Sequence, residues 1–120
     1  MDLSIIILNY KSSDYLAKCL KSIYASKLGK YKVEIIIVDN HSPDNSIKLA
    51  QSLKPLLTTN YYLLNTNNGF AYGNNIGVKH ADKNSRYLLF LNPDTTVKPD
   101  TFYHCLQFMD QHHEAAAMTV

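Results

Sequence analysis

Four short apolar runs, each followed by a stretch with helical spacing, constrain the fold of this 120-residue chain more than any other feature. Strand and helix alternate four times, and this order favours right-handed crossovers between parallel strands. We therefore expect an α/β fold, a Rossmann-like and mostly parallel sheet with helices on both faces. The last run is apolar throughout, which is typical of a strand covered on both faces. The predicted strands are residues 3–8, 33–39, 61–64 and 87–91.

The stretches between the runs carry helix signals. Apolar residues at the spacing of one helix face predict a helix over residues 14–25, and Ser12 or Ser13 can cap its first turn. Ser42 followed by Pro43 predicts the start of a second helix, with serine as the N-cap. Two further helices are expected over residues 70–80 and from Pro99 onward, and residues 115–120 fit the start of a further strand.

Charge and hydropathy argue against two classes of partner. The net charge is +2 and the lysines are scattered, whereas a nucleic-acid-binding surface needs a basic stripe or patch. No apolar run approaches the roughly 20 residues that span a bilayer. Cys19 and Cys105 show no CxxC spacing and fall in helical patterns, so we expect reduced thiols and a cytoplasmic location.

Polar side chains follow each predicted strand. Because the carboxyl ends of parallel strands share one edge, these residues should form a single rim where ligands of open α/β sheets bind. The rim is rich in carboxylates and amides and almost free of basic residues, so phosphates bound there would need a divalent cation. The rim residues are Asn9, Tyr10, Asp39, Asn40, His41, residues 65–69, Asn92 and Asp94.

Simpler structural roles remain open for several of these residues. Asp39 also suits a loop cap, Asp94 suits a turn, and Tyr10 suits partial surface packing. Gly69 and two more glycines recur every four residues, which favours close approach of a helix either to the sheet or to a bound ligand. The first loop, NYKSSD, lacks both GxGxxG and a Walker lysine motif, which argues against dinucleotide and P-loop sites.

Four motifs in order, from Leu3 to Met109, resemble the family-2 nucleotide-sugar glycosyltransferases of the GT-A fold. The motifs are SIIILNYKSSDYLAKCLKSI, EIIIVDNHSPDNS, NNGFAYGNNIGVKHA and YLLFLNPDT. The last one is similar to the rhamnosyltransferase-like branch, in which the DxD motif is written NPD. An ordered set of four motifs is far more specific than a lone DxD.

The resemblance implies roles for the rim residues. Asn9 and Tyr10 would line the base and ribose pocket, and Asp39 would accept a hydrogen bond from the nucleobase. Asn92 and Asp94 match the two ends of DxD, with Asp94 as the ligand of Mn²⁺ or Mg²⁺. Asn92 departs from the motif because it offers only a neutral carbonyl oxygen, so the metal would depend on Asp94, water and the diphosphate. The other implied donor-binding residues are Asn40, Asn68 and Gly69.

The resemblance also implies an enzyme that transfers a sugar from a nucleotide-diphosphate sugar to an acceptor glycan or lipid-linked sugar, in cell-surface polysaccharide synthesis. Residues 1–120 would be its donor-binding part, with the acceptor site and the Asp or Glu general base outside this chain, which alone should be inactive. The alternative is a non-catalytic nucleotide-sugar-binding module. We also expect association into a homo-oligomer through the C-terminal side, and peripheral attachment of the full-length protein to the inner face of the membrane.

Overall fold

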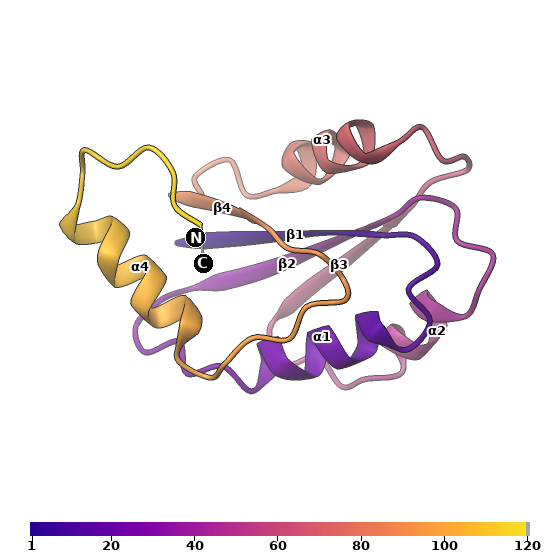
Figure 1. Ribbon diagram of the computed structural model, residues 1–120, viewed down its shortest axis with the longest axis horizontal. Coiled ribbons are helices and arrows are strands. Elements are labelled where there is room, and N and C mark those ends of the chain that lie inside the picture. Colours follow the sequence, from indigo (N-terminus) through magenta and orange to yellow (C-terminus); the bar gives the residue numbers. More distant parts are fainter. Residues whose placement is uncertain (120) are drawn as a thin grey trace.

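The computed structural model describes residues 1–119 and contains one sheet of four parallel strands, in the order β3-β2-β1-β4 (Figure 1). Each strand is followed by a helix, as the alternating pattern predicted. The elements are β1 Leu3–Asn9, α1 Tyr15–Tyr24, β2 Val33–Asp39, α2 Ser46–Gln51, β3 Thr58–Leu63, α3 Phe70–His80, β4 Tyr87–Phe90 and α4 Thr101–Gln111.

The two central strands pair along their whole length. Their register runs from Leu3 opposite Val33 to Asn9 opposite Asp39, so both strands end at the same level. The outer strands differ in this respect. β3 begins three residues earlier than predicted and reaches Asp39, whereas the last pair of β4 joins Phe90 to Ile6, three residues before β1 ends.

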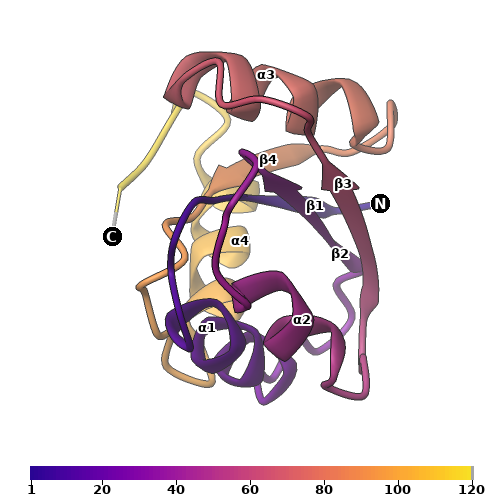
Figure 2. The ribbon, with the colours of Figure 1, turned by 90° about the vertical axis from the view of Figure 1, so that its right-hand side faces the viewer.

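Helices cover both faces of the sheet, which confirms the predicted fold class (Figure 2). Alternate residues of β1 and β2 point to opposite faces because the side-chain period of a strand is two. Ile5 and Ile7 pack in the larger core under α1, α2 and α4, and Ile6 packs in a smaller core under α3. All three side chains are fully buried.

The two glycines inside α3 let this helix approach the sheet closely. A Cβ atom at Gly73 would collide with the Leu8 side chain, and one at Gly77 would collide with Ile6. Of the two explanations that the glycine spacing left open, contact with the sheet is the one that the structure shows for these two positions. Gly69 differs, because it precedes the helix and a Cβ atom there would meet open space.

The prediction that β4 is covered on both faces is wrong. Leu88 and Phe90 are 43% and 53% exposed, while Leu89 packs against the larger core. The reason is the placement of α3, which contacts β1 and β2 and leaves the same face of the edge strand β4 uncovered. The uniform apolar pattern of this strand therefore corresponds to one buried face and one apolar face that residues 1–119 leave about half exposed.

Three other expectations also fail. Ser42 and Pro43 do not start a helix, since α2 begins at Ser46 with Asn45 as its N-cap residue, and the Ser12 hydroxyl bonds to Asn9 instead of capping α1. Residues 115–119 form no strand, and Val120 lies outside the described residues. Within that described part, no helix is long and apolar enough to cross a membrane.

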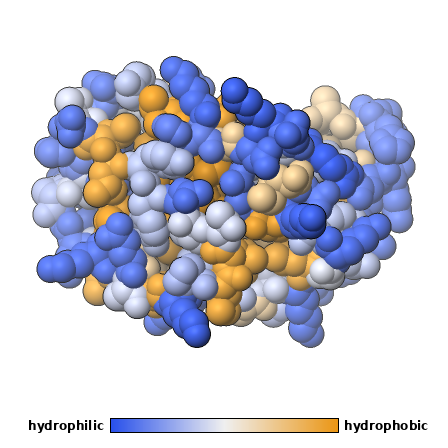
Figure 3. All heavy atoms as spheres, turned by 180° about the vertical axis from the view of Figure 1, so that it is seen from behind, coloured by the Kyte–Doolittle hydropathy of each residue, from blue (hydrophilic) through white to orange (hydrophobic). Residues whose placement is uncertain are grey.

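Exposed apolar side chains also occur on the β3 side of the molecule. Leu56, in the loop before β3, and Leu63, at its end, are both exposed. Figure 3 shows the face turned away from the viewer in Figure 1, where apolar patches lie between hydrophilic side chains. The apolar surface of this face is therefore divided and not one continuous sheet.

Candidate functional site

The carboxyl ends of the central strands bring the first two predicted rim segments together. Asn9 ends β1 directly opposite Asp39, and the Asn40 backbone N–H donates to the Asn9 carbonyl oxygen at 2.9 Å. On the other side, the Leu64 N–H donates to the Asp39 carbonyl oxygen at 2.9 Å. The loops after β1, β2 and β3 therefore leave the sheet side by side, as expected for parallel strands.

Asp39 is the central carboxylate of this edge. Its Oδ1 accepts hydrogen bonds from Asn9 Nδ2 at 2.8 Å and from the Ser42 hydroxyl at 2.6 Å. Its Oδ2 accepts the backbone N–H of Ser42 at 2.9 Å. Asp39 thus also organises its own loop, the structural role that the sequence left open, while its carboxylate stays at the strand end with no cationic partner in residues 1–119.

Asn9 lies beneath Asp39 and is fully buried. Its Nδ2 also donates to the Ser46 hydroxyl at 2.8 Å, and its Oδ1 accepts the hydroxyl of Ser12. These bonds satisfy both the donor and the acceptor side of the amide inside the protein. The side chain that was predicted to line the donor pocket is therefore oriented toward other protein groups in this structure.

Two residues of the loop after β2, Ser42 and Asp44, and the first residue of α2, Ser46, support the site, and this role was missed in the sequence. Ser42 bonds to Asp39, as described, and its hydroxyl also accepts the Lys11 N–H at 3.0 Å. Asp44 accepts the Ser13 N–H at 2.9 Å and the Ser46 hydroxyl at 2.6 Å. Partial burial works to raise the pKa of Asp44, but the hydrogen bonds from Ser46 and Ser13 outweigh it and hold the pKa below its usual value.

The sequence did contain a signal for this support. A serine three residues after an aspartate suits an Asx-type turn as well as a helix N-cap, and the helix-start pattern at Ser42 and Pro43 concealed the turn. Since the Ser42 hydroxyl bonds Asp39, it is not available to cap α2.

The backbone of the two loops is strained. Lys11 and Ser13 have φ of 50°, and His41 has φ of 60°; these are the non-glycine residues with positive φ in the described chain. A non-glycine residue in this region costs on the order of 1–3 kcal/mol, and such residues cluster at functional sites. Here the strain is confined to the segments that follow Asn9 and Asp39.

A third loop is tied to the site by Asn40. Its Nδ2 donates to the Gly69 carbonyl oxygen at 3.1 Å, which links the end of β2 to the start of α3. Gly69 has φ of 94°, a conformation that favours glycine. The Asn40 Oδ1 is buried and has no hydrogen-bond partner in residues 1–119, and a buried acceptor of this kind calls for a donor from water or ligand.

Two more predicted donor residues lie at the exposed rim. Tyr10 follows Asn9 and is 44% exposed, with the Lys11 Nζ 5.3 Å from the centre of its ring. Asn68 is exposed as well, and its Oδ1 accepts the Thr66 hydroxyl at 3.0 Å. Both side chains are open to a ligand, in contrast to Asn9.

The pairing of β4 with β1 ends three residues before β1 does, so the turn after β4 starts further from the rim than the loops after β1 and β2. The Leu91 N–H donates to the Ile6 carbonyl oxygen at 2.9 Å, and the chain then turns through a bond from the Thr95 N–H to the Asn92 carbonyl oxygen. The side chains of Asn92 and Asp94 are exposed. Burial raises the pKa of the Cys19 thiol to about 12, and the nearby charge of Asp94 adds to this effect, which places Asp94 beside α1.

The donor set at this turn fits a hard cation only when other ligands contribute. Asp94 supplies one carboxylate and Asn92 one carbonyl oxygen, and both are oxygen ligands of the kind that Mg²⁺ and Mn²⁺ accept. In residues 1–119 no cluster of three or more His, Cys, Asp or Glu side chains is arranged to hold a metal ion. An ion here would therefore be shared with the oxygens of a bound diphosphate and with water.

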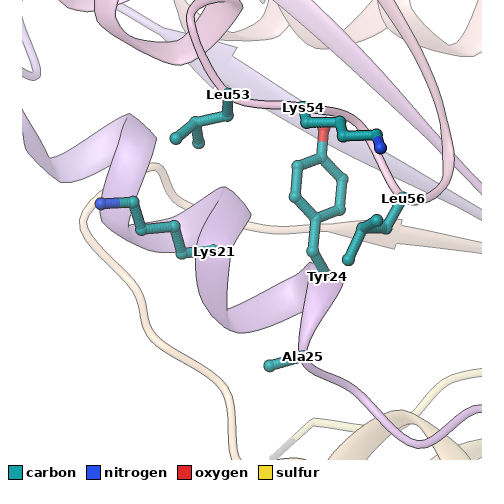
Figure 4. A pocket seen from close by; sticks show the side chains of 6 residues that line it. All are labelled: Lys21, Tyr24, Ala25, Leu53, Lys54 and Leu56. Atoms are coloured by element: carbon teal, nitrogen blue, oxygen red, sulfur yellow. The ribbon is translucent and has the colours of Figure 1, made fainter.

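Two surface hollows lie away from this edge. The first, of about 280 Å³, lies between the end of α1 and the loop before β3 (Figure 4). The second, of about 420 Å³, is lined mainly by the end of α3 and the loop before β4. Both are open and near the amino ends of the strands, and the first contains no carboxylate or amide side chain. Neither matches the polar rim in position or chemistry. The side chains around the first are Lys21, Tyr24, Ala25, Leu53, Lys54 and Leu56.

Comparison with known proteins agrees with the resemblance seen in the motifs. The family model described as glycosyl transferase family 2 matches residues 4–120. The minor teichoic acid biosynthesis protein GgaB of Bacillus subtilis is 32% identical over 112 residues, which are 92% of this chain and 12% of the relative. The poly(ribitol-phosphate) beta-N-acetylglucosaminyltransferase TarS of Staphylococcus aureus is 26% identical over 94% of this chain and 20% of its own.

Solved structures match over the same region. The crystal structure of S. aureus TarS 1-349 in complex with UDP-GlcNAc superposes with a TM-score of 0.85 over 94% of this chain and 32% of that one. The mannosyltransferase PcManGT from Pyrobaculum calidifontis, in complex with GDP-Man and Mn²⁺, shares the fold with a TM-score of 0.81 at 19% identity. The chain spans 12% to 32% of the length of these relatives and structures. With the family model matching nearly all of its residues, the chain belongs to glycosyl transferase family 2.

Proposed function

We propose that this chain is the donor-binding part of a glycosyltransferase that takes a sugar from a nucleotide-diphosphate sugar and acts in cell-surface polysaccharide synthesis. The carrying observation is Asp39, a carboxylate held at the carboxyl end of β2 by three hydrogen bonds and paired with no cation in residues 1–119. The names of the relatives support the reaction class, since GgaB is a teichoic acid biosynthesis protein and TarS an N-acetylglucosaminyltransferase.

In this proposal five of the rim residues bind or frame the nucleoside part of the donor. Asp39 accepts an N–H of the nucleobase, while Tyr10 and Asn68 flank the nucleotide from the exposed side. Asn40 and Gly69 hold the third loop against the second. The acceptor, a glycan or lipid-linked sugar, would bind outside these residues.

The diphosphate is assigned to the turn after β4. Asp94, with Asn92 beside it, would hold Mn²⁺ or Mg²⁺ together with the phosphate oxygens. When bound, the ion neutralises the charge that develops on the departing diphosphate. The complex of PcManGT with GDP-Man and Mn²⁺ supports a metal in proteins of this fold.

A binding panel tests the proposal. UDP-, GDP- and dTDP-sugars are added to the chain with and without manganese, and thermal stability is followed together with calorimetry. A ligand that binds only the folded state raises stability by about 2.7 kcal/mol at a hundredfold excess over its Kd. Stabilisation by none of these donors, with or without metal, would refute the proposal.

Three further expectations remain predictions. The chain alone should transfer no sugar, because the acceptor site and general base would lie outside it; transfer by the purified chain would refute this. Two free cysteines suit a reducing, cytoplasmic compartment, with the full-length protein at the inner face of the membrane.

Exposed Leu88 and Phe90 on the edge strand β4 support self-association through the C-terminal side, which light scattering at high concentration would test.

A further inference from the structure

We propose that Asn9 and Ser42 are positioning residues that decide which nucleobase Asp39 accepts. The inference rests on the proposed function, in which Asp39 binds the base of the donor. It departs from the expectation that Asn9 touches the nucleotide, because Asn9 is completely buried whereas Asp39 retains 5% exposure. The acceptor sites of the Asp39 carboxylate that protein groups already occupy decide which donors of a base it can still accept.

An ionised carboxylate offers about four acceptor sites, two on each oxygen. Asn9 Nδ2 and the Ser42 hydroxyl occupy both sites of Oδ1, at 2.8 and 2.6 Å. The Ser42 backbone N–H occupies one site of Oδ2, at 2.9 Å. A ligand therefore finds one free site, on Oδ2.

Neighbouring bonds keep Oδ1 occupied. The Asn9 amide cannot turn over, because its oxygen accepts the Ser12 hydroxyl and its nitrogen also donates to Ser46 at 2.8 Å. The Ser42 oxygen accepts the Lys11 N–H at 3.0 Å, so the hydroxyl hydrogen is directed to Asp39. A network in which every member is satisfied is rigid, and the free site on Oδ2 is fixed with it.

A single acceptor site discriminates between bases by their donors. The imide edge of uracil or thymine presents one N–H between two carbonyl oxygens, which one site satisfies. Guanine presents two adjacent donors, and one of them would enter the site without a partner, which is costly in a desolvated position. The geometry therefore selects a uridine or thymidine diphosphate over a guanosine diphosphate.

The test removes the two donors to Oδ1 and measures the ratio of affinities for UDP and GDP by calorimetry, at one fixed metal concentration. We expect the wild-type chain to prefer UDP by about tenfold or more, the scale of one hydrogen bond to a charged group. Ser42→Ala frees the Oδ1 site that faces a partly exposed side chain, so the ratio should fall to within about threefold. Asn9→Ala frees the site that faces the interior and removes the bond that holds the carboxylate in place, so the ratio should fall as well. Ser42→Thr keeps the hydroxyl and should restore the preference.

The chain offers a matched control at the other end of the same strand. The Ser4 hydroxyl donates to the buried Glu34 at 2.6 Å, the same distance as Ser42 to Asp39. Ser4→Ala removes an equivalent bond far from the rim and should leave the UDP to GDP ratio unchanged. If Asn9 or Ser42 had only a structural role, its replacement would weaken the binding of UDP and of GDP by the same factor, and the ratio of the two affinities would not change.

The possible outcomes distinguish a failure of the positioning role from a failure of the proposed function. Wild-type binding of UDP with the ratio retained in both variants would overturn the positioning role, as would a wild-type preference for GDP. Binding of no nucleotide by the wild type would instead overturn the proposed function. Where Asn9→Ala does not fold by circular dichroism, Ser42→Ala alone decides, because Ser42 is only partly buried.

Discussion

β2 carries a buried carboxylate at each end, Glu34 at the amino end and Asp39 at the carboxyl end, and the two are used differently. Each accepts a serine hydroxyl at 2.6 Å and a backbone N–H, from Asp82 at 2.7 Å and from Ser42 at 2.9 Å. Glu34 closes the loop after α3 onto the sheet. Asp39 faces the loops that carry strained backbone and the orphaned oxygen of Asn40.

The surroundings of the two carboxylates make the difference larger. At the amino end, Arg86 pairs with both Asp2 and Asp110, and the hydroxyls of Tyr31 and Tyr87 donate to Asp110. At the carboxyl end, no cation in residues 1–119 pairs with Asp39 or Asp94. One end of the sheet thus neutralises its charges internally and stabilises the fold, while the other keeps negative charge that suits a metal and the N–H of a base.

The largest effect is expected at the carboxyl end, on metal-dependent binding. Asp94→Asn should abolish the manganese-dependent part of nucleotide binding, because it removes the only carboxylate of the turn, and the fold should survive since the residue is exposed. Asn92→Asp should have the opposite effect and tighten the binding of the metal ion, because it adds a second carboxylate. Calorimetry with and without Mn²⁺ measures both. Unchanged metal dependence in Asp94→Asn would show that the turn has no ligand role.

Removing each carboxylate of β2 compares the two ends directly. Asp39→Ala should weaken nucleotide binding by about 1.5–3 kcal/mol, the range for a hydrogen bond to a charged group. Glu34→Ala should leave the affinity unchanged but lower the free energy of unfolding by about 1–3 kcal/mol, because the Ser4 hydroxyl and the Asp82 N–H lose their acceptor. Calorimetry and urea unfolding on both variants provide the test, and equal losses of affinity would remove the distinction.

Gly73 and Gly77 of α3 differ in the side chain that an added methyl group would meet, so substitutions at the two positions should differ in their effect on stability. Gly77→Ala should destabilise the chain by about 1–3 kcal/mol, because the new methyl group collides with the branched, fully buried Ile6. Gly73→Ala should cost less, since the colliding atom is the far end of the flexible Leu8, and alanine favours the helix by about 1 kcal/mol. Urea unfolding measures both, and a larger loss for Gly73→Ala would contradict the packing described here.

The smallest effect is expected on the pH dependence of stability, through the carboxylate of Asp110. Burial works to raise the pKa of Asp110, but hydrogen bonds from Tyr87 and Tyr31 and the charge of Arg86 outweigh it and hold the pKa below its usual value. Because the folded-state pKa is lower than the unfolded one, the stabilisation is present above the unfolded-state pKa and is lost as the pH falls through the folded-state pKa. The melting temperatures of wild type and Asp110→Asn should therefore differ near neutral pH and converge at low pH. A constant difference would exclude this linkage.

Local patterns in the sequence predicted most of the architecture. The apolar runs gave the positions of β1 and β2, and the helical spacing placed α3 with the bounds observed. The juxtaposition of Asn9 and Asp39 also followed from the sequence, because ends of adjacent parallel strands share an edge. These features are predictable since strand period, helix period and crossover order are properties of short segments and of their order along the chain.

Long-range contacts decided the rest. Ser42 carries a good N-cap signal, yet its hydroxyl donates to Asp39, three residues earlier, and accepts a hydrogen bond from Asn9. The bond from Asn9 spans 33 positions and leaves no mark in local periodicity. The exposure of Leu88 and Phe90 depends on where α3 lies, which the apolar pattern of β4 does not encode. By itself the sequence determined which elements form, in what order, and which polar residues end the strands. Only the tertiary structure decided that Asn9 is buried under Asp39 and which carboxylate oxygen remains free, because register and packing fix side-chain partners that no single segment contains.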